Sequence, residues 1–227
     1  MLEVLQMTDV LDVMEKAAVG TGAMLLEMQP RAKSLSTRKD FVSDADLRSE
    51  ELILRILRSR FPDIPILSEE AGGVALRTGY LWVIDPVDGT INYFFQDEHW
   101  GVSIALVRDS QTIAGVVYLP AKDLLFSATS ESATQVCRPG RSESWQECRV
   151  RPLANPKDCQ IWHDWGKGLH DGADHRRVVE LHAKINAVIP YPQMRNGCIA
   201  SASMVALGRI AGYFFASPEP FLSLIHI

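Results

Sequence analysis

The stretch WVIDPVDGTINY, residues 82–93, decides the fold of this chain. Trp82 to Asp85 is an apolar run that ends in a carboxylate, which is the pattern of a buried strand as it leaves the core. Pro86 is expected to stop the hydrogen-bond ladder of that strand, and Gly89 to permit a tight bend with exposed backbone amides. The stretch therefore predicts a buried strand followed at once by an acidic turn.

Two aspartates flank this bend. Asp85 and Asp88 are three residues apart, so both carboxylates can converge on one point. Ionised carboxylates about 4 Å apart repel by roughly 4 kcal/mol at an effective dielectric constant of about 20, so the pair needs a cation, a shared proton or separation into solvent. A site made of oxygen atoms favours a hard ion, Mg²⁺ before Zn²⁺. A turn in which both aspartates are only turn formers explains the same residues, so DPVDG alone leaves both interpretations open.

The stretch WVIDPVDGTIN resembles the central motif of the inositol monophosphatase family, which comprises Mg²⁺-dependent, lithium-sensitive phosphatases. The pattern Asp-Pro-x-Asp-Gly-Thr-x-Asn after an apolar strand is rarely met by chance. The resemblance extends from the first helix to about Phe215 and is weakest between Ser130 and Asn186. It implies an α/β fold, a layered α-β-α-β-α sandwich formed by a single domain over residues 1–227.

The composition is that of an ordinary globular protein, with 227 residues, 47% hydrophobic, 22% charged and a mean hydropathy of +0.00. A net charge of −5 argues against a surface that binds polyanions, so we expect no nucleic-acid partner. The sequence opens with no basic-then-apolar leader and holds no apolar run of membrane-spanning length, so we expect a cytoplasmic protein with no membrane partner. The cysteines form no C-x-x-C pair and are expected to be free thiols: Cys137, Cys148, Cys159 and Cys198.

A first helix is expected to start with Thr8 as its N-cap and to end before Pro30, because apolar residues recur at helical spacing between them. Gly20 and Gly22 lie inside this helix and therefore do not indicate a phosphate-binding loop. The basic segment 31–39 is expected to be a loop, either simply solvated or an entrance that attracts an anionic substrate.

A second helix is expected to begin near Ser43 or Asp44. Asp46 would then lie in its first turn, where the helix dipole favours a negative charge, and this is one explanation for the residue. The family has a Val-Thr-x-x-Asp motif at this place, and VSDAD resembles it with Ser43 in place of Thr. The resemblance implies that Asp46 is the catalytic aspartate.

The apolar run 64–67 predicts a strand that delivers the acidic sequence SEEAGG. An exposed acidic turn explains Glu69 and Glu70 as well as a functional site does. The family pattern is Gly-Glu-Glu, with Ser68 here in place of Gly. The resemblance implies that Glu69 is a catalytic metal ligand. It implies that Glu70 acts on the metal indirectly, either by contacting a metal ligand or through a bound water.

The rest of the chain predicts a meander followed by strand–helix alternation. An N-terminal helix and meander layer would cover about residues 1–130, and an incomplete C-terminal α/β layer about 150–227. Histidine spacing fits no metal motif. The expected elements are strands at 102–107, 112–118 and 124–128, surface turns and edge strands at 130–158, a strand at 160–163, a helix within 176–183, a small-residue helix through Leu207 and a strand at Gly212–Phe215.

The segment RNGCIASA resembles the family's Arg-x-x-Gly-Ser-Ala-Ala sequence, which lines the substrate hydroxyls. The resemblance implies substrate contacts from Gly197, Cys198 and Ala200. Close packing of a small-residue helix on the sheet explains the same residues equally well.

The resemblance also implies the mechanism, the hydrolysis of a small phosphate monoester like inositol 1-phosphate with two or more Mg²⁺ ions. Glu69, Asp85 and the Val87 carbonyl would hold the first ion, and Asp85 and Asp88 the second. The amides of Gly89 and Thr90 would bind phosphate, and the Thr90 hydroxyl, hydrogen-bonded to Asp46, would orient the attacking water. A related sugar, nucleotide-bisphosphate or histidinol-phosphate phosphatase remains an alternative, as does a non-catalytic binding relative.

The end of the sequence departs from the family pattern. Family members continue to a Trp-Asp motif that completes the second metal site, whereas this chain ends in PEPFLSLIHI. The sequence His163-Asp164-Trp165 has the two residues in reverse order and too early to substitute. We therefore expect a C-terminally truncated fragment with a foreign tail, an incomplete second metal site and weak catalysis. The full-length protein is expected to be a homodimer.

Overall fold

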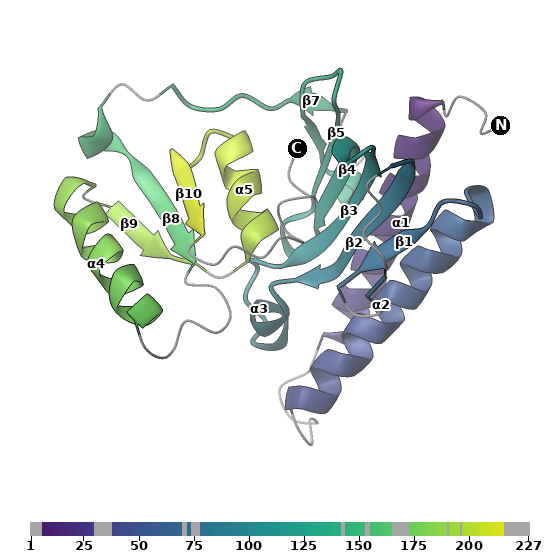
Figure 1. The fold of residues 1–227 in the computed structure, drawn as a ribbon, viewed down its shortest axis with the longest axis horizontal. Coiled ribbons are helices and arrows are strands. Elements are labelled where there is room, and N and C mark those ends of the chain that lie inside the picture. Colours follow the sequence, from purple (N-terminus) through teal and green to yellow (C-terminus); the bar gives the residue numbers. More distant parts are fainter. Residues whose placement is uncertain are drawn as a thin grey trace.

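Two β-sheets and the helices around them form five alternating layers, as Figure 1 shows. The computed structural model describes residues 6–29, 38–69, 72–73, 78–141, 144–152, 155–164, 173–189, 191–195 and 197–215. The expected α-β-α-β-α order is confirmed. Helices α1 and α2 form one outer layer, α5 lies between the sheets, and α4 covers the far side of the small sheet.

The large sheet carries its seven strands in chain order. Its first pair is parallel and all the following pairs are antiparallel. The two long helices cover one face, and the short helix α3 follows the second strand. The elements of this half are α1 (Met7–Met28), α2 (Arg38–Arg60), β1 (Ile66–Ser68), β2 (Tyr80–Asp88), α3 (Thr90–Phe94), β3 (Gly101–Arg108), β4 (Gln111–Leu119), β5 (Leu124–Thr129), β6 (Gln135–Cys137) and β7 (Gln146–Glu147).

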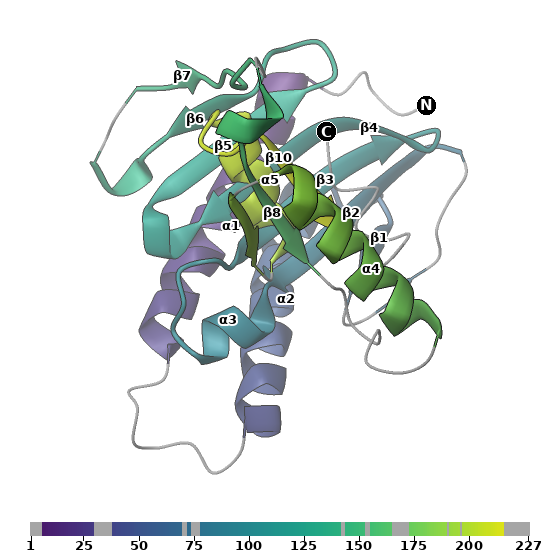
Figure 2. The same cartoon turned by 90° about the vertical axis from the view of Figure 1, so that its left-hand side faces the viewer.

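The small sheet is parallel, with its strands in the order β10-β8-β9. Figure 2 shows this sheet in front of α5, with α4 on its outer side. The elements are β8 (Gln160–Asp164), α4 (Ala173–Val188), β9 (Tyr191–Met194), α5 (Cys198–Ala206) and β10 (Gly212–Phe215). The expected meander, the expected strands and the small-residue helix are all present, within two or three residues at their ends.

The core has two main parts, one on each face of the large sheet. The first lies under α1 and α2 and includes the buried side chains of Met14, Ile53 and Trp82. The second lies under α5, where Phe126 and Ile199 pack together. In the part of the chain that the structure describes, no helix has the length and apolar character that crossing a membrane requires. The four cysteines are free, as expected.

Both long helices begin earlier than the sequence predicted. α1 starts at Met7 after Gln6, without a side-chain cap, so the assignment of Thr8 as N-cap is wrong. α2 starts at Arg38, which places Asp46 about two turns inside the helix and not in its first turn. Asp44 does not cap the helix, because its carboxylate accepts a hydrogen bond from Arg48 Nε at 2.9 Å. The helix dipole therefore does not explain Asp46.

Strand β2 also runs further than expected. Pro86 does not end the ladder, because β2 continues to Asp88 through a register shift between Asp85 and Asp88 against β3. A bulge leaves residues unpaired, and for this reason it accommodates a proline that has no N–H to donate. The strand therefore carries both aspartates, one on each side of the bulge.

Gly22 shows why a glycine lies inside α1. A β-carbon at this position would meet the Tyr118 ring at 2.5 Å and Pro120 Cγ at 2.6 Å. The close approach of α1 to the sheet therefore depends on the missing side chain. Gly20 is exposed in the same helix, and a β-carbon there would meet nothing within 4 Å.

We expect Gly22→Ala to lower the free energy of unfolding by about 1–3 kcal/mol through overpacking. The matched variant Gly20→Ala should instead raise it by about 0.5–1 kcal/mol, because alanine favours the helix over glycine. Urea unfolding of both variants measures the difference. Equal stability of the two variants would contradict the packing assigned to Gly22.

Candidate active site

The acidic turn, residues 85–90, comprises the end of β2 and the start of α3 and is held together by its own polar groups. The carboxylates of Asp85 and Asp88 are buried, with 2% and 7% of each residue exposed. The Val87 amide donates to Asp85 Oδ1 at 3.1 Å, and the Thr90 hydroxyl donates to the Val87 carbonyl at 3.0 Å. The turn is therefore an ordered structure; the sequence predicted its two acids, and the structure adds that both are buried.

Gly89 makes the tight bend between β2 and α3. Its φ is +79°, and a β-carbon there would lie 2.7 Å from the carbonyl oxygen of His99. The same carbonyl accepts a hydrogen bond from Asn92 Nδ2 at 2.7 Å. Both the left-handed conformation and the crowding require glycine at this position.

Gly197, at the start of α5, packs closely against the same His99 carbonyl. Its φ is +103°, and a β-carbon there would lie 2.6 Å from the His99 oxygen. The His99 carbonyl thus lies between two glycines from distant parts of the sequence. This packing places the first turn of α5 directly against the acidic turn.

Asp88 joins these two segments by hydrogen bonds. Its Oδ2 accepts the Ile199 amide at 2.9 Å, and the nearby Cys198 amide also lowers the pKa of this carboxyl. Burial raises the pKa of the Asp88 carboxyl to about 7; the Ile199 amide opposes the rise and the Glu69 carboxylate adds to it. The fold therefore holds a carboxylate whose charge is only partly compensated.

Asp164 is a site residue that the sequence analysis set aside. It ends β8, and its Oδ2 accepts the Gly197 amide at 3.2 Å. Its negative charge also raises the pKa of the Asp88 carboxyl. The available signal was its position directly after the strand expected at 160–163, although nothing in the neighbouring sequence assigns it a role.

Glu69 lies in the exposed turn after β1, and its negative charge adds to the rise in the pKa of the Asp88 carboxyl. Because β1 and β2 are parallel neighbours, their carboxyl ends meet at one edge of the sheet. The Glu69 amide donates to the Ile84 carbonyl at 3.2 Å, which fixes this end of β1. Glu70 lies outside the described residues.

Asp46 approaches the site from α2. The residue is 6% exposed. Burial raises the pKa of Tyr93 in α3, and the Asp46 carboxylate adds to that rise. The expected bond from the Thr90 hydroxyl to Asp46 is not the one formed, because that hydroxyl donates its single proton to Val87.

Cys198 and Ala200 are buried residues of the first turn of α5. Burial raises the pKa of the Cys198 thiol to about 12, and its sulfur lies 3.1 Å from the Tyr213 hydroxyl. A thiol with so high a pKa is a poor nucleophile. Ala200 is fully buried in the core between α5 and the large sheet, where close packing accounts for its size.

The donor atoms at this edge fit Mg²⁺ chemically. The carboxylates of Glu69, Asp85 and Asp88 and the Val87 carbonyl supply oxygen only, and a carbonyl that accepts one hydrogen bond still has a second lone pair. Burial is the main cause of the raised pKa of the Asp88 carboxyl, and the charges of Glu69 and Asp164 add to it; a bound cation would favour the ionised form. Within the described ranges, no three His, Cys, Asp or Glu side chains are grouped as a metal ion would require, so these carboxylates do not by themselves form a ready-made metal site.

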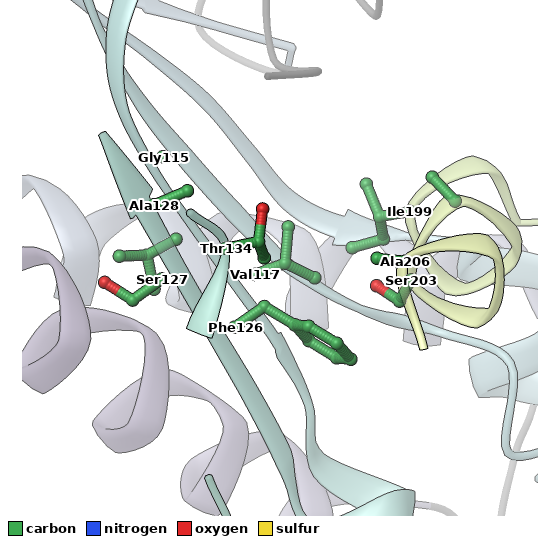
Figure 3. Close-up of a pocket in the computed structure, with 11 residues that line it drawn as sticks. Gly115, Val117, Phe126, Ser127, Ala128, Thr134, Ile199, Ser203 and Ala206 are labelled. Atoms are coloured by element: carbon green, nitrogen blue, oxygen red, sulfur yellow. The ribbon is translucent and has the colours of Figure 1, made fainter. Parts of the chain in front are cut away.

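A separate cavity of about 110 Å³ lies between the large sheet and α5. Figure 3 shows Val117 and Phe126 of the sheet facing Ile199 and Ser203 of the helix. The lining contains hydroxyl groups but no carboxylate, histidine or basic side chain. Its chemistry is therefore not that of a phosphate or metal site.

The sequence profile of the inositol monophosphatase family matches residues 6–221. A Nus factor SuhB from Xylella fastidiosa is 33% identical over 215 residues, which are 90% of this chain and 72% of that protein. A protein named fructose-1,6-bisphosphatase/inositol-1-monophosphatase from Aquifex aeolicus is 38% identical over 120 residues, 51% of this chain and 46% of that one. The match thus spans about half the length of the second relative.

Solved structures show the same fold. The extragenic suppressor protein SuhB from Bartonella henselae superposes with a TM-score of 0.82 at 25% identity, covering 96% of this chain and 83% of that one. An inositol monophosphatase from Anabaena superposes with a TM-score of 0.80 at 24% identity, covering 97% and 80%.

The buried carboxyl of Asp88 gives a pH prediction for the metal-free chain. Since its pKa is raised from 3.8 to about 7 on folding, the folded chain keeps this proton at pH values where the unfolded chain has lost it. Stability should therefore fall as pH rises from about 4 to about 7. Asp88→Asn removes the titration and keeps an oxygen for the Ile199 amide, so its stability should fall less.

Urea unfolding after chelation, at several pH values, compares the two proteins. Equal pH slopes would contradict the raised pKa of this carboxyl.

Proposed function

This chain belongs to the inositol monophosphatase family, and on that premise we propose that it hydrolyses a small phosphate monoester with Mg²⁺. The observation that supports this most is the meeting of Asp85, Asp88 and the Gly89 turn at one buried edge of the sheet. There the protein concentrates negative charge next to the first amides of a helix, which have no partner within that helix. Such a combination suits a cation and a phosphate together.

We assign the cation ligands from the chemistry of the donors. Glu69, Asp85 and the Val87 carbonyl would hold one Mg²⁺, and Asp85 and Asp88 would hold a second. When bound, Mg²⁺ would neutralise the phosphoryl oxygens and make water more acidic. Because Ile199 already occupies Asp88 Oδ2, the other oxygen of this carboxylate is the natural cation ligand.

The turn itself would bind the phosphate group. Gly89 is the N-cap and Thr90 the first residue of α3, and the first amides of a helix have no partner within it. These two amides would donate to phosphate oxygens. Because the turn is fixed by the Val87 and His99 carbonyls, the donors are already oriented before a substrate arrives.

Thr90 and Asp46 would handle the attacking water. With its proton donated to Val87, the Thr90 oxygen presents lone pairs that can accept a hydrogen bond from water. Thr90 would thereby orient the water, and Asp46 would stabilise the positive charge that develops on it.

Asp85→Asn tests the proposed reaction most directly. The change keeps the side-chain shape but removes the charge of a ligand shared by both cations, so we expect Mg²⁺-dependent phosphate release to be abolished. Asp63→Asn, on an exposed turn, is the matched control. Release within about threefold of the parent would mean a loss of less than ~0.7 kcal/mol in the barrier and would refute the assignment.

Contacts to the metal and the phosphate do not distinguish one alcohol from another, so other residues must select the substrate. Inositol-selective members of the family place a glutamate where this chain has Phe215 or Ala216. Neither side chain can accept a hydrogen bond from a substrate hydroxyl, and such bonds can contribute strongly to discrimination.

We therefore expect weak selectivity among phosphate esters. A panel of inositol 1-phosphate, glycerol phosphate, fructose 1,6-bisphosphate, a nucleotide bisphosphate and histidinol phosphate measures kcat/KM for each. A preference above about a hundredfold for the inositol ester over glycerol phosphate would contradict this expectation.

A Nus-factor role is a second candidate. Relatives from Xylella fastidiosa, Pasteurella multocida and Haemophilus influenzae carry the name Nus factor SuhB. Such a role is separable from hydrolysis, because Asp85→Asn should remove phosphate release and leave the Nus-factor role intact. Complementation of a strain that lacks its Nus factor, with the parent and with this variant, distinguishes the two.

A further inference from the structure

The start of α5 is held by two carboxylates that come from different sheets. The Ile199 amide donates to Asp88 at the end of β2. The Gly197 amide, two residues earlier, donates to Asp164 at the end of β8. Figure 1 shows both strands ending towards the first turn of this helix, one on each side of it. Two amides at the start of α5 are thus held by two aspartates that are distant in the sequence.

α5 cannot cap itself. Its N-cap residue is Gly197, which has no side chain and makes no side-chain cap hydrogen bond. A larger residue is excluded there, since a β-carbon would lie 2.6 Å from the His99 carbonyl. Helix amides that are buried without a partner are costly. The packing that brings α5 against the acidic turn therefore creates a need for acceptors from elsewhere, and Asp164 meets part of that need.

We propose that Asp164 is a positioning residue of the active site, which holds the first turn of α5 so that the Ile199 amide of the same turn fixes the Asp88 carboxylate. The inference rests on the proposed function only for its effect on Mg²⁺, since the hydrogen bonds themselves do not depend on it. In this role Asp164 acts through a carboxylate oxygen that accepts a hydrogen bond, and its negative charge is not needed. Its negative charge opposes that of Asp88, so the charge alone would weaken the site before a cation binds.

The two possible roles of Asp164 separate by substitution. Asp164→Asn keeps a side-chain oxygen that can accept the Gly197 amide, and it removes the charge. Asp164→Ala removes both. If Asp164 positions α5 through its acceptor oxygen, the asparagine variant has the amide exchange and the Mg²⁺ dependence of the parent, and the alanine variant does not. If the residue is a direct cation ligand, both variants lose Mg²⁺ affinity. Asp158→Ala, at an exposed residue shortly before β8, is the matched control.

The first measurement is hydrogen exchange at the amides of Gly197, Cys198 and Ile199 in the metal-free full chain. We expect exchange to accelerate about tenfold or more in Asp164→Ala and to stay within about threefold of the parent in Asp164→Asn. Circular dichroism shows that each variant is folded, and the exchange of core amides in β3 and β4 provides an internal reference. Unchanged exchange at α5 in a folded Asp164→Ala protein would overturn the proposal.

The second measurement is the Mg²⁺ concentration that gives half-maximal phosphate release. We expect it to rise about tenfold or more in Asp164→Ala and to change little in Asp164→Asn, as for other residues that orient a metal ligand. Equal loss in both variants would overturn the positioning role and assign Asp164 to the cation. A parent protein without Mg²⁺-dependent release would refute the proposed function, while the exchange experiment would still decide the role of Asp164.

Discussion

The hydrogen bond from the Ile199 amide to Asp88 is the contact on which the rest of the site depends. It joins residues 111 positions apart in the sequence at 2.9 Å, and it links the large sheet to the helix between the sheets. A charge-assisted hydrogen bond of this kind is stronger than a neutral one, because the carboxylate is buried and the helix dipole points at it. The neighbouring glycines, Gly89 and Gly197, allow the two segments to approach closely enough for it to form.

Much of the large sheet and the position of the acidic turn could be predicted from the sequence, because both depend on local pattern. Alternating apolar residues predicted the meander, and Gly89 predicted the bend. Pro86 misled the analysis, since a missing N–H normally ends a ladder. The bulge that accommodates it depends on the pairing with β3, which no local pattern reveals.

The starts of the helices and the contacts of several site residues could not be predicted from the local sequence either. Ser43 and Asp44 look like caps, but Asp44 forms an i,i+4 pair with Arg48 within a longer helix. Asp164 acts on an amide 33 positions away, so neither its spacing nor its neighbours in the sequence identify its role. The Thr90 hydroxyl likewise bonds to Val87, because the bulge brings that carbonyl within reach. The first of these contacts follows from the true start of α2 and the second from tertiary packing, whereas the third follows from the bulge in β2; the sequence pattern reveals none of these three features.

The charges at the site also set an order of events in the proposed reaction. The chain has a net charge of −5, and the site holds the carboxylates of Asp85, Asp88 and Asp164. A phosphate ester that approaches the site without a cation therefore meets repulsion from several carboxylates. Backbone amides carry only partial charges and cannot reverse a potential of that sign. A cation that binds the folded chain would both relieve this repulsion and stabilise the fold. Binding of the cation should therefore precede that of the phosphate ester, because the site attracts an anion only after the carboxylates have been neutralised.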